Sequence, residues 1–557
     1  YTSSRKFKMR FLGLNPDLFV PMFLTFILLR MKSTFNIAKM LINGIKFFMK
    51  KRVNSTVTLA TTASDQGKNS EERLNNIIDK CISQLQLTMV QVNSSLEIDV
   101  MLKSQLFFTL YETCVYMCIV SILSFLWTTG FHCAEPEDDA DSWMIATMMV
   151  ITATISLQSL LQIWYLTGMS AREAQIGLIT GISVFIIVLA LQFSGFPLFS
   201  VSTVTSLAEH TNALYLQVSR DAKALQLTSL VNIVTGAIAL LIGSIAMILV
   251  IPALHFAKTL QTLCFGKKYE KAAVEVRVNL WMDFFSPLVV CFFLSSLPKS
   301  LFSLIYSMIG QEGSNGKSVN VFEQYLLLIQ IFMVLTFCKY RLGNMKVHLQ
   351  AFMDSVINTV AVSMINQQYS TTSLTILQEK VQLRANYLVA AAIQYVSVPS
   401  FALMAMLLIH RYSSYGTGVC EGVHAMLKTG KSKIVHSIAT QRLEFNPTKF
   451  ALAATQDIEY TPYLVDAILA LLGFVPTPKL ASGEKGPKVS AAKVLQSFLL
   501  RVSKIATPPV AVAADFLSSL LLVFFLLYFC INLFALLGWM YAPELLLNSK
   551  IQKKTEV

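Results

Sequence analysis

Charged residues are scarce in this chain. Asp, Glu, Lys and Arg make up only 14% of its 557 residues, against about 25% in an ordinary soluble protein. Hydrophobic residues account for 54%, and the mean hydropathy is +0.58. A composition this poor in charge excludes an ordinary soluble enzyme or binding domain and indicates a polytopic membrane protein.

The familiar motifs of catalysis and metal binding are also missing. The sequence has no H-E-x-x-H zinc motif, no G-x-S-x-G nucleophile turn and no C-x-x-C pair, and its seven histidines never recur at i, i+4 spacing. The segment GQEGSNGKS at 310–318 resembles a phosphate-binding loop, but its glycine spacing is wrong and an apolar run precedes it instead of a strand. We therefore expect no enzymatic activity, no cofactor and no metal.

A net charge of +13 gives the chain a basic balance. Its Lys and Arg residues lie beside hydrophobic runs, not in blocks interleaved with exposed aromatic residues. This placement is typical of membrane flanks and not of a nucleic-acid interface. We expect the partner of these charges to be a lipid bilayer with anionic headgroups, and we expect no nucleic acid.

Long apolar runs predict the fold. A search for about 18 or more mostly apolar residues in a row gives nine candidate membrane spans. They cover residues 12–31, 106–127, 144–166, 176–193, 229–254, 280–308, 323–340, 387–409 and 515–539. The predicted fold class is all-α, a polytopic integral membrane helical bundle with about nine spans (8–10) and amphipathic interfacial helices.

Two segments outside the spans show helical periodicity. In residues 33–52 the side chains of Ile37, Leu41, Ile45 and Phe48 fall on one face of a helix and lysines on the other, which predicts an amphipathic helix at the membrane interface. Residues 71–90 carry a second helical pattern. The span at 280–308 contains prolines, which favour a kinked or re-entrant segment.

These patterns divide the chain into five parts. The list of parts is 1–52, a first anchor with the amphipathic helix; 53–105, a polar loop with a helical segment; 106–409, the main transmembrane bundle; 410–514, a large extramembrane loop with short helices; and 515–557, the last span with a basic tail.

Loop charges predict the orientation. The acidic loop at 135–141 is expected on the non-cytoplasmic side, and the basic segments at 265–277, 339–384 and 550–557 in the cytoplasm. Cys133 and Cys420 then lie on the same non-cytoplasmic side, where they either form a disulfide or remain two thiols. The glycosylation sequons at Asn54 and Asn93 are predicted on the cytoplasmic side, where they would stay unmodified.

Two ionisable residues lie inside predicted spans, Glu112 and Lys299. A charge at the centre of a membrane helix costs about 2.5 to 3.5 kcal/mol, so each such residue needs a structural or functional reason. One interpretation is an ion or proton pathway. The other, which we favour, is a lock between helices or a position near the membrane interface.

The segment KYRLGNMKVHLQAF at 339–352 carries a resemblance to a known family. Arg341, Met345, His348 and Gln350 are part of a pattern similar to R-L-x-x-M-[RK]-x-H-L-Q-A-[YF] of the transmembrane protein 161 family. The order continues in AIQYVSVP, where Gln394 and Tyr395 resemble I-A-L-Q-Y-V-A-P of that family. Weaker matches extend over most of the chain. Periodicity places 339–352 where a helix leaves the bilayer, and we predict that His348 lies near the membrane boundary and contacts another protein segment.

The resemblance implies a eukaryotic multispan membrane protein without established catalytic activity, associated in animals with membrane excitability and stress responses. We therefore expect a non-enzymatic accessory or regulatory component that acts on ion channels or a larger membrane assembly through helix packing, with protein partners in the membrane. One alternative is an ion channel or secondary transporter with Glu112 and Lys299 near its path. Another is a structural subunit of a membrane complex. The expected location is the plasma membrane or an endomembrane, and the oligomeric state is open.

Overall fold

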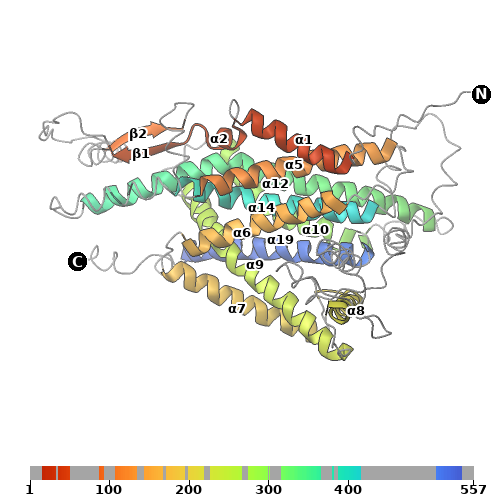
Figure 1. Cartoon of the computed structure of the whole chain (residues 1–557). Helices are drawn as coiled ribbons and strands as arrows, with labels where there is room; N and C mark the ends of the chain where they lie inside the picture. Colours follow the sequence, from red (N-terminus) through yellow and green to blue (C-terminus); the bar gives the residue numbers. More distant parts are fainter. Residues whose placement is uncertain are drawn as a thin grey trace, which may run out of the picture.

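A bundle of long helices forms most of the structure (Figure 1). The computed structural model describes residues 16–32, 36–50, 87–92, 107–134, 143–166, 171–194, 198–218, 226–265, 274–298, 300–301, 315–365, 379, 381, 387–414 and 510–541.

Each of the nine predicted spans corresponds to a helix in this part of the chain. The helices are α1 (Pro16–Met31), α5 (Phe108–Ala134), α6 (Trp143–Leu166), α7 (Ala171–Phe193), α9 (Leu227–Cys264), α10 (Val274–Leu294), α12 (Asn315–Ile365), α14 (Leu388–Ser414) and α19 (Val510–Tyr541). Eight of them are long and apolar enough to cross a membrane, and α1 contributes a shorter apolar stretch, Val20–Met31. The predicted all-α polytopic membrane fold is confirmed.

Several of the predicted span boundaries are wrong, and two of them change the interpretation of a segment. The span expected to end at residue 340 belongs to α12. This helix is 51 residues long in total and ends at Ile365. The candidate membrane span within α12 runs from Leu326 to Asp354, so the segment 339–352 is the last part of this span and the helix continues beyond it. Conversely, α10 ends at Leu294, so the run 280–308 is not one span. The helix α10 includes Pro287 and ends before Ser295 and Ser296, where the Ser295 hydroxyl donates to the carbonyl of Phe292.

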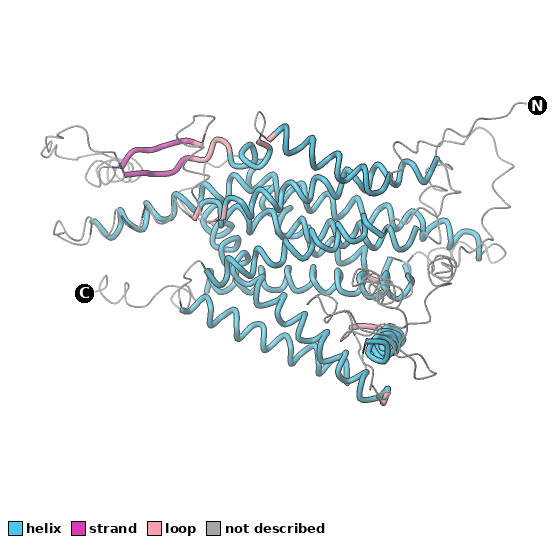
Figure 2. Tube along the Cα trace, viewed as in Figure 1, coloured by secondary structure: helices cyan, strands magenta, loops and turns pink. Residues whose placement is uncertain are grey.

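The amphipathic helix predicted over 33–52 is also wrong. The structure has a six-residue helix there, α2 (Ile37–Ile42), followed by a strand, β1 (Lys46–Lys50). Gly44 separates them with a φ of 93°, a conformation that side chains other than hydrogen disfavour. The strand pairs antiparallel with β2 (Leu87–Gln91), so the last residues of the predicted helix 71–90 form a strand instead (Figure 2). Residues 71–86 lie outside the described part.

One helix was not predicted at all. α8 (Val201–Val218) is seen almost end-on in Figure 1 while the long helices lie across the view, so it runs crosswise to the bundle, at the end away from the hairpin of β1 and β2. It buries Val204 and Ala208 and exposes Ser202 and Glu209. This amphipathic composition contains too many polar residues for a search that looks for continuous apolar runs.

The centre of the bundle is α14. All of its apolar window, Leu388–Arg411, is buried, and it packs against α5, α6, α12 and α19. The last helix, α19, packs against α9, α10 and α14, so it belongs to the same bundle as the spans between residues 106 and 409. The core is therefore built from helices that are far apart in the sequence.

Candidate functional site

A cluster of buried ionisable side chains, called the charged cluster below, lies inside this bundle. Asp283 comes from α10, and Arg341 and His348 come from α12. Nη1 of Arg341 lies 3.6 Å from Oδ2 of Asp283, and Nε2 of His348 lies 3.7 Å from the same oxygen atom. Because Arg341 and His348 are seven residues apart, they are on one face of α12, about two turns from each other. One helix face thus directs two nitrogen-bearing side chains at one carboxylate.

Burial around the cluster is complete. The side chains of Arg341, His348 and Asp283 are 1%, 0% and 0% exposed. Within the described residues, none of their side-chain nitrogen or oxygen atoms has a hydrogen-bond partner. The charged groups are therefore stabilised by Coulombic attraction and by their aromatic neighbours.

Three aromatic rings surround the guanidinium group. Cζ of Arg341 is 4.7 Å from the ring centre of Phe256, 4.5 Å from that of Tyr395 and 5.6 Å from that of Tyr528. These rings belong to α9, α14 and α19. A desolvated cation over an aromatic face gains about 2 kcal/mol. The cluster therefore connects α10 and α12 to three further helices.

The imidazole of His348 lies between two of the same rings. Its ring centre is 5.0 Å from that of Tyr395, nearly parallel to it, and 4.9 Å from that of Phe256. His348 thus contacts α9, α10 and α14 from within α12, in the candidate span Leu326–Asp354. Arg341 does not face the cytoplasm as a basic residue at a helix exit would.

The backbone beside Asp283 has an unusual local arrangement. Pro287 has no N–H group, so the carbonyl of Asp283 lacks its regular helical donor. The hydroxyl of Ser286 donates to that carbonyl instead, at 3.0 Å. One turn before Asp283, the carbonyl of Asn279 accepts a hydrogen bond from the side chain of Asn344 at 2.9 Å. The faces of α10 and α12 therefore meet through polar groups over two turns.

The remaining residues of the family-like pattern have other roles. Met345 is buried. Oε1 of Gln394 is 3.0 Å from Nδ1 of His255, which links α14 to α9 next to the cluster. Gln350 is outside the cluster: its Oε1 accepts from the N–H of Lys46 at 2.9 Å, and its Nε2 donates to the carbonyl of Lys46 at 3.3 Å. This side chain therefore joins α12 to strand β1 through two hydrogen bonds.

Glu112 lies at a contact of the first helices and not in the charged cluster. Its carboxylate is paired with Nζ of Lys32 at 2.5 Å and accepts from Nδ2 of Asn36 at 2.6 Å. The neighbouring Tyr111 hydroxyl donates to the carbonyl of Ala38 at 3.0 Å. These contacts hold α5 against the segment that runs from α1 to α2, which is the geometry of an interhelical lock.

Other predicted site residues are not described by the structure. Lys299, Cys420, Asn54 and Asn93 lie outside the described residues, and Cys133 is at the end of α5 without a described side chain. The Glu112–Lys299 pathway, the disulfide and the unmodified sequons therefore stay predictions.

Sequence reasoning missed three residues of the cluster. Asp283 was detectable, since it is an acidic residue inside the apolar run 280–308. Phe256 and Tyr528 carry no such signal, because aromatic residues are frequent throughout the spans. Only the packing of α9 and α19 brings their rings to Arg341.

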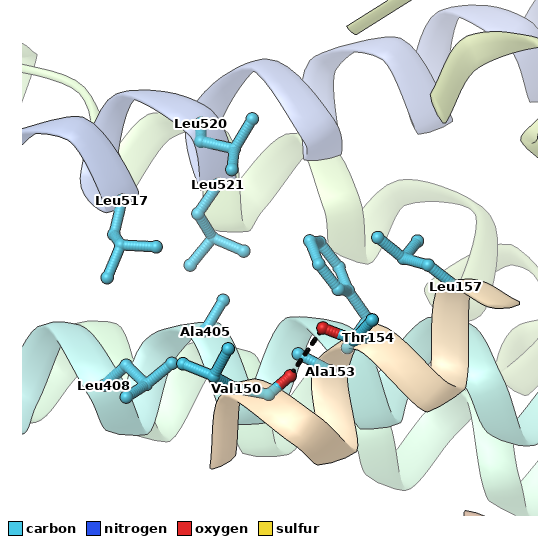
Figure 3. A pocket seen from close by; sticks show the side chains of 10 residues that line it. Val150, Ala153, Thr154, Leu157, Ala405, Leu408, Leu517, Leu520 and Leu521 are labelled. Atoms are coloured by element: carbon cyan, nitrogen blue, oxygen red, sulfur yellow. Dashed lines mark hydrogen bonds between the residues drawn. The ribbon is translucent and has the colours of Figure 1, made fainter. Parts of the chain in front are cut away.

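A cavity of about 120 Å³ lies elsewhere, between α6, α14 and α19 (Figure 3). Ten residues line it: Val150, Ala153, Thr154, Leu157, Phe401, Ala405, Leu408, Leu517, Leu520 and Leu521. A search of the described residues for three or more His, Cys, Asp or Glu side chains placed to hold a metal ion finds none. The charged cluster is therefore the candidate functional site, and the cavity is separate from it.

Comparison with known protein families identifies the family of this chain. A family model described as predicted transmembrane protein 161AB matches residues 13–461. The matched region includes Asp283, Arg341, His348 and Tyr395, and it ends before α19, which supplies Tyr528. No curated protein and no solved structure matches the chain.

Proposed function

Because this chain belongs to the family of predicted transmembrane protein 161AB, we propose that it acts without catalysis, as an accessory or regulatory component of a membrane. It influences an ion channel or a larger membrane assembly by packing its helices against that partner. The membrane excitability that the family resemblance implies is consistent with a channel as the partner.

One observation carries this proposal, the closed charged cluster in the bundle. Asp283 and Arg341 neutralise each other and are surrounded by Phe256, Tyr395 and Tyr528. A buried pair of this kind fixes the helices that supply it, because breaking it leaves an uncompensated buried charge. The charged groups of the interior thus support a rigid bundle, and contact with a partner is left to the outer helix faces.

The outer helix α7 offers such a face. Only 17% of its apolar window is buried. Aliphatic side chains that are more than half exposed follow one another along it: Leu178, Ile179, Ile182, Ile186 and Ile187. In a bilayer such residues contact either lipid or another membrane helix, and association depends on close packing instead of a hydrophobic driving force.

A photo-reactive amino acid at position 182 tests the proposed contact. In native membranes we expect the probe on α7 to cross-link to one defined membrane protein. The same probe at Leu249, a fully buried position on α9, is the matched control and should cross-link only within the chain. Cross-links from position 182 that involve lipid alone would contradict the proposal for this face.

A second candidate function is conduction or transport. Three ionisable residues lie within candidate spans and have no hydrogen-bond partner among the described atoms, and intramembrane ionisable residues commonly mark ion or proton paths. In that case Asp283 and His348, and not Glu112 with Lys299, would carry the charge.

An ion-flux assay separates the two functions. Purified protein is reconstituted into liposomes, and cation, anion and proton fluxes are compared with those of empty liposomes. The accessory function predicts no flux above the empty liposomes. A specific flux that Asp283→Asn abolishes in protein that is still folded would overturn it in favour of conduction, and Glu112→Gln serves as the variant outside the cluster.

A further inference from the structure

The cavity between α6, α14 and α19 has a defined architecture. Its floor is α14, through Phe401, Ala405 and Leu408, all of them buried. Its two walls are α6 and α19, and Figure 3 shows Leu517 and Leu521 of α19 pointing across the gap toward α14 and α6. The cavity is thus a groove in the ring of helices that encloses α14.

Small side chains create its depth. Ala405 on the floor and Ala153 on the α6 wall stand among leucines, so the space that a longer side chain would fill stays open. Dispersion attraction is lost wherever lining atoms have no partner at contact distance. An apolar group that enters this groove therefore regains those contacts.

The lining excludes water and polar ligands. Thr154 carries the single side-chain heteroatom, and its hydroxyl already donates to the carbonyl of Val150 at 2.8 Å (Figure 3). A buried water needs two to four polar partners, and an ion needs a charged or strongly polar one. Neither requirement is met here, so the occupant must be hydrocarbon.

The size and position of the cavity limit which apolar molecule can occupy it. A cavity of about 150 Å³ with a Leu, Ile and Phe lining holds one benzene molecule, so 120 Å³ accepts several methylene groups of one chain but not the fused rings of a sterol. The rim is open to the outside of the bundle, since Val150 is 48% exposed. All three helices contribute from their candidate spans, where lipid hydrocarbon is the surrounding medium.

We propose that this groove binds a single acyl chain of a membrane lipid. The chain lies against α14 between α6 and α19 and fills the space left by Ala153 and Ala405. This site is independent of the charged cluster and of the proposed partner contact.

Photolabelling tests the site. The protein is placed in nanodiscs of phosphatidylcholine, a part of which carries a diazirine on one acyl chain, and labelled peptides are identified by mass spectrometry. We expect peptides with residues 150–157 and 405–408 to be labelled above the level of residues 178–187 on the exposed face of α7. Ala405→Leu or Ala153→Leu fills the groove, so each should abolish the excess labelling and leave 178–187 unchanged.

Gly236→Leu is the matched control, because a Cβ atom added at Gly236 meets no atom within 4 Å. It should leave labelling of the groove unchanged. Unfolding temperatures verify that each variant is folded, and a photo-reactive residue at the exposed Thr154 tests the site without filling it. The proposal is overturned if groove peptides are labelled no more than 178–187, if both filling variants keep the excess, or if the probe at Thr154 cross-links to residues 410–514 or to another protein instead of lipid.

Discussion

We expect substitutions of Arg341 and Asp283 to have the largest effect on the stability of this protein. Both are fully buried, and each is the charged partner of the other. Removing one partner of a buried ion pair leaves the other charge uncompensated, which typically costs about 3 to 5 kcal/mol, whereas replacing both is much better tolerated. The destabilisation caused by substituting one residue therefore depends on whether the other charge is still present.

A double-mutant cycle tests this dependence. We predict that Arg341→Met and Asp283→Asn each destabilise the bundle by about 3 to 5 kcal/mol, and that the double variant is more stable than either single variant. Unfolding in detergent is the measurement. Effects that simply add in the double variant would show that the two charges do not interact.

We expect substitution of Gln350 to affect stability only locally, unlike substitution of Arg341 or Asp283. At a partly exposed position it makes two hydrogen bonds with the backbone of Lys46, and its Nε2 also donates to Oδ1 of Asp354 at 2.9 Å. Gln350→Glu keeps the acceptor and replaces the donor by a second acceptor, which opposes the carbonyl of Lys46 and the carboxylate of Asp354. We predict a loss of about 1 kcal/mol that is confined to strand β1.

Hydrogen exchange at residues 45–47 measures this loss. Exchange should accelerate in Gln350→Glu, while the unfolding temperature of the bundle changes little. Gln330 provides the control, because its side chain bonds to the carbonyl of Phe293 at a different contact. If Gln330→Glu accelerates exchange at 45–47 equally, the contact with Gln350 does not hold the strand.

At the scale of elements, the contact of α7 with α9 depends on two glycines. A Cβ atom on Gly243 would lie 2.8 Å from the carbonyl oxygen of Gly181, and one on Gly181 would lie 3.0 Å from the carbonyl oxygen of Gly243. Small residues let membrane helices approach closely, and their packing drives association in lipid. The two helices therefore have no room for a methyl group at this crossing.

Two alanine substitutions on the same helix make a matched pair. Gly243→Ala should destabilise the protein by about 1 to 3 kcal/mol, because the backbones must separate. Gly236→Ala adds its methyl group in open space and should stabilise by roughly 0.5 to 1 kcal/mol through reduced backbone freedom in the unfolded chain. Equal effects on unfolding temperature would contradict the close approach.

At the scale of the whole molecule, the elements outside the bundle define its two ends. The hairpin of β1 and β2 and the last turns of α12 project from one end, and α8 lies across the opposite end (Figure 1). The loop charges predict that the end with the hairpin is cytoplasmic. α8 would then lie on the other side of the membrane.

Single-cysteine labelling tests this topology. In a background without the native cysteines, an impermeant thiol reagent applied outside intact cells should label cysteine at Thr211, an exposed residue of α8. Cysteine at the exposed Lys46 should react only after permeabilisation. The reverse result would invert the topology, and labelling of both positions from one side would contradict the arrangement of the two ends.

Much of the architecture follows from local sequence. The nine helices were predictable because apolar runs of span length have few alternatives in a bilayer. The strand at 46–50 was not, because KFFMK fits the face of a helix as well as a strand, and the choice depends on Gly44 and on pairing with β2, about 40 residues away. The length of α12 was missed for a related reason, since its basic residues suggested an exit.

The sequence alone therefore determined a helical membrane bundle and the family, because hydropathy and a spaced motif are properties of short windows. Tertiary structure decided whether a polar residue of that motif faces water or the interior. Arg341 is buried because Asp283, Phe256, Tyr395 and Tyr528 from four other helices compensate its desolvation together. No window of the sequence contains that compensation, since it exists only once the helices have packed.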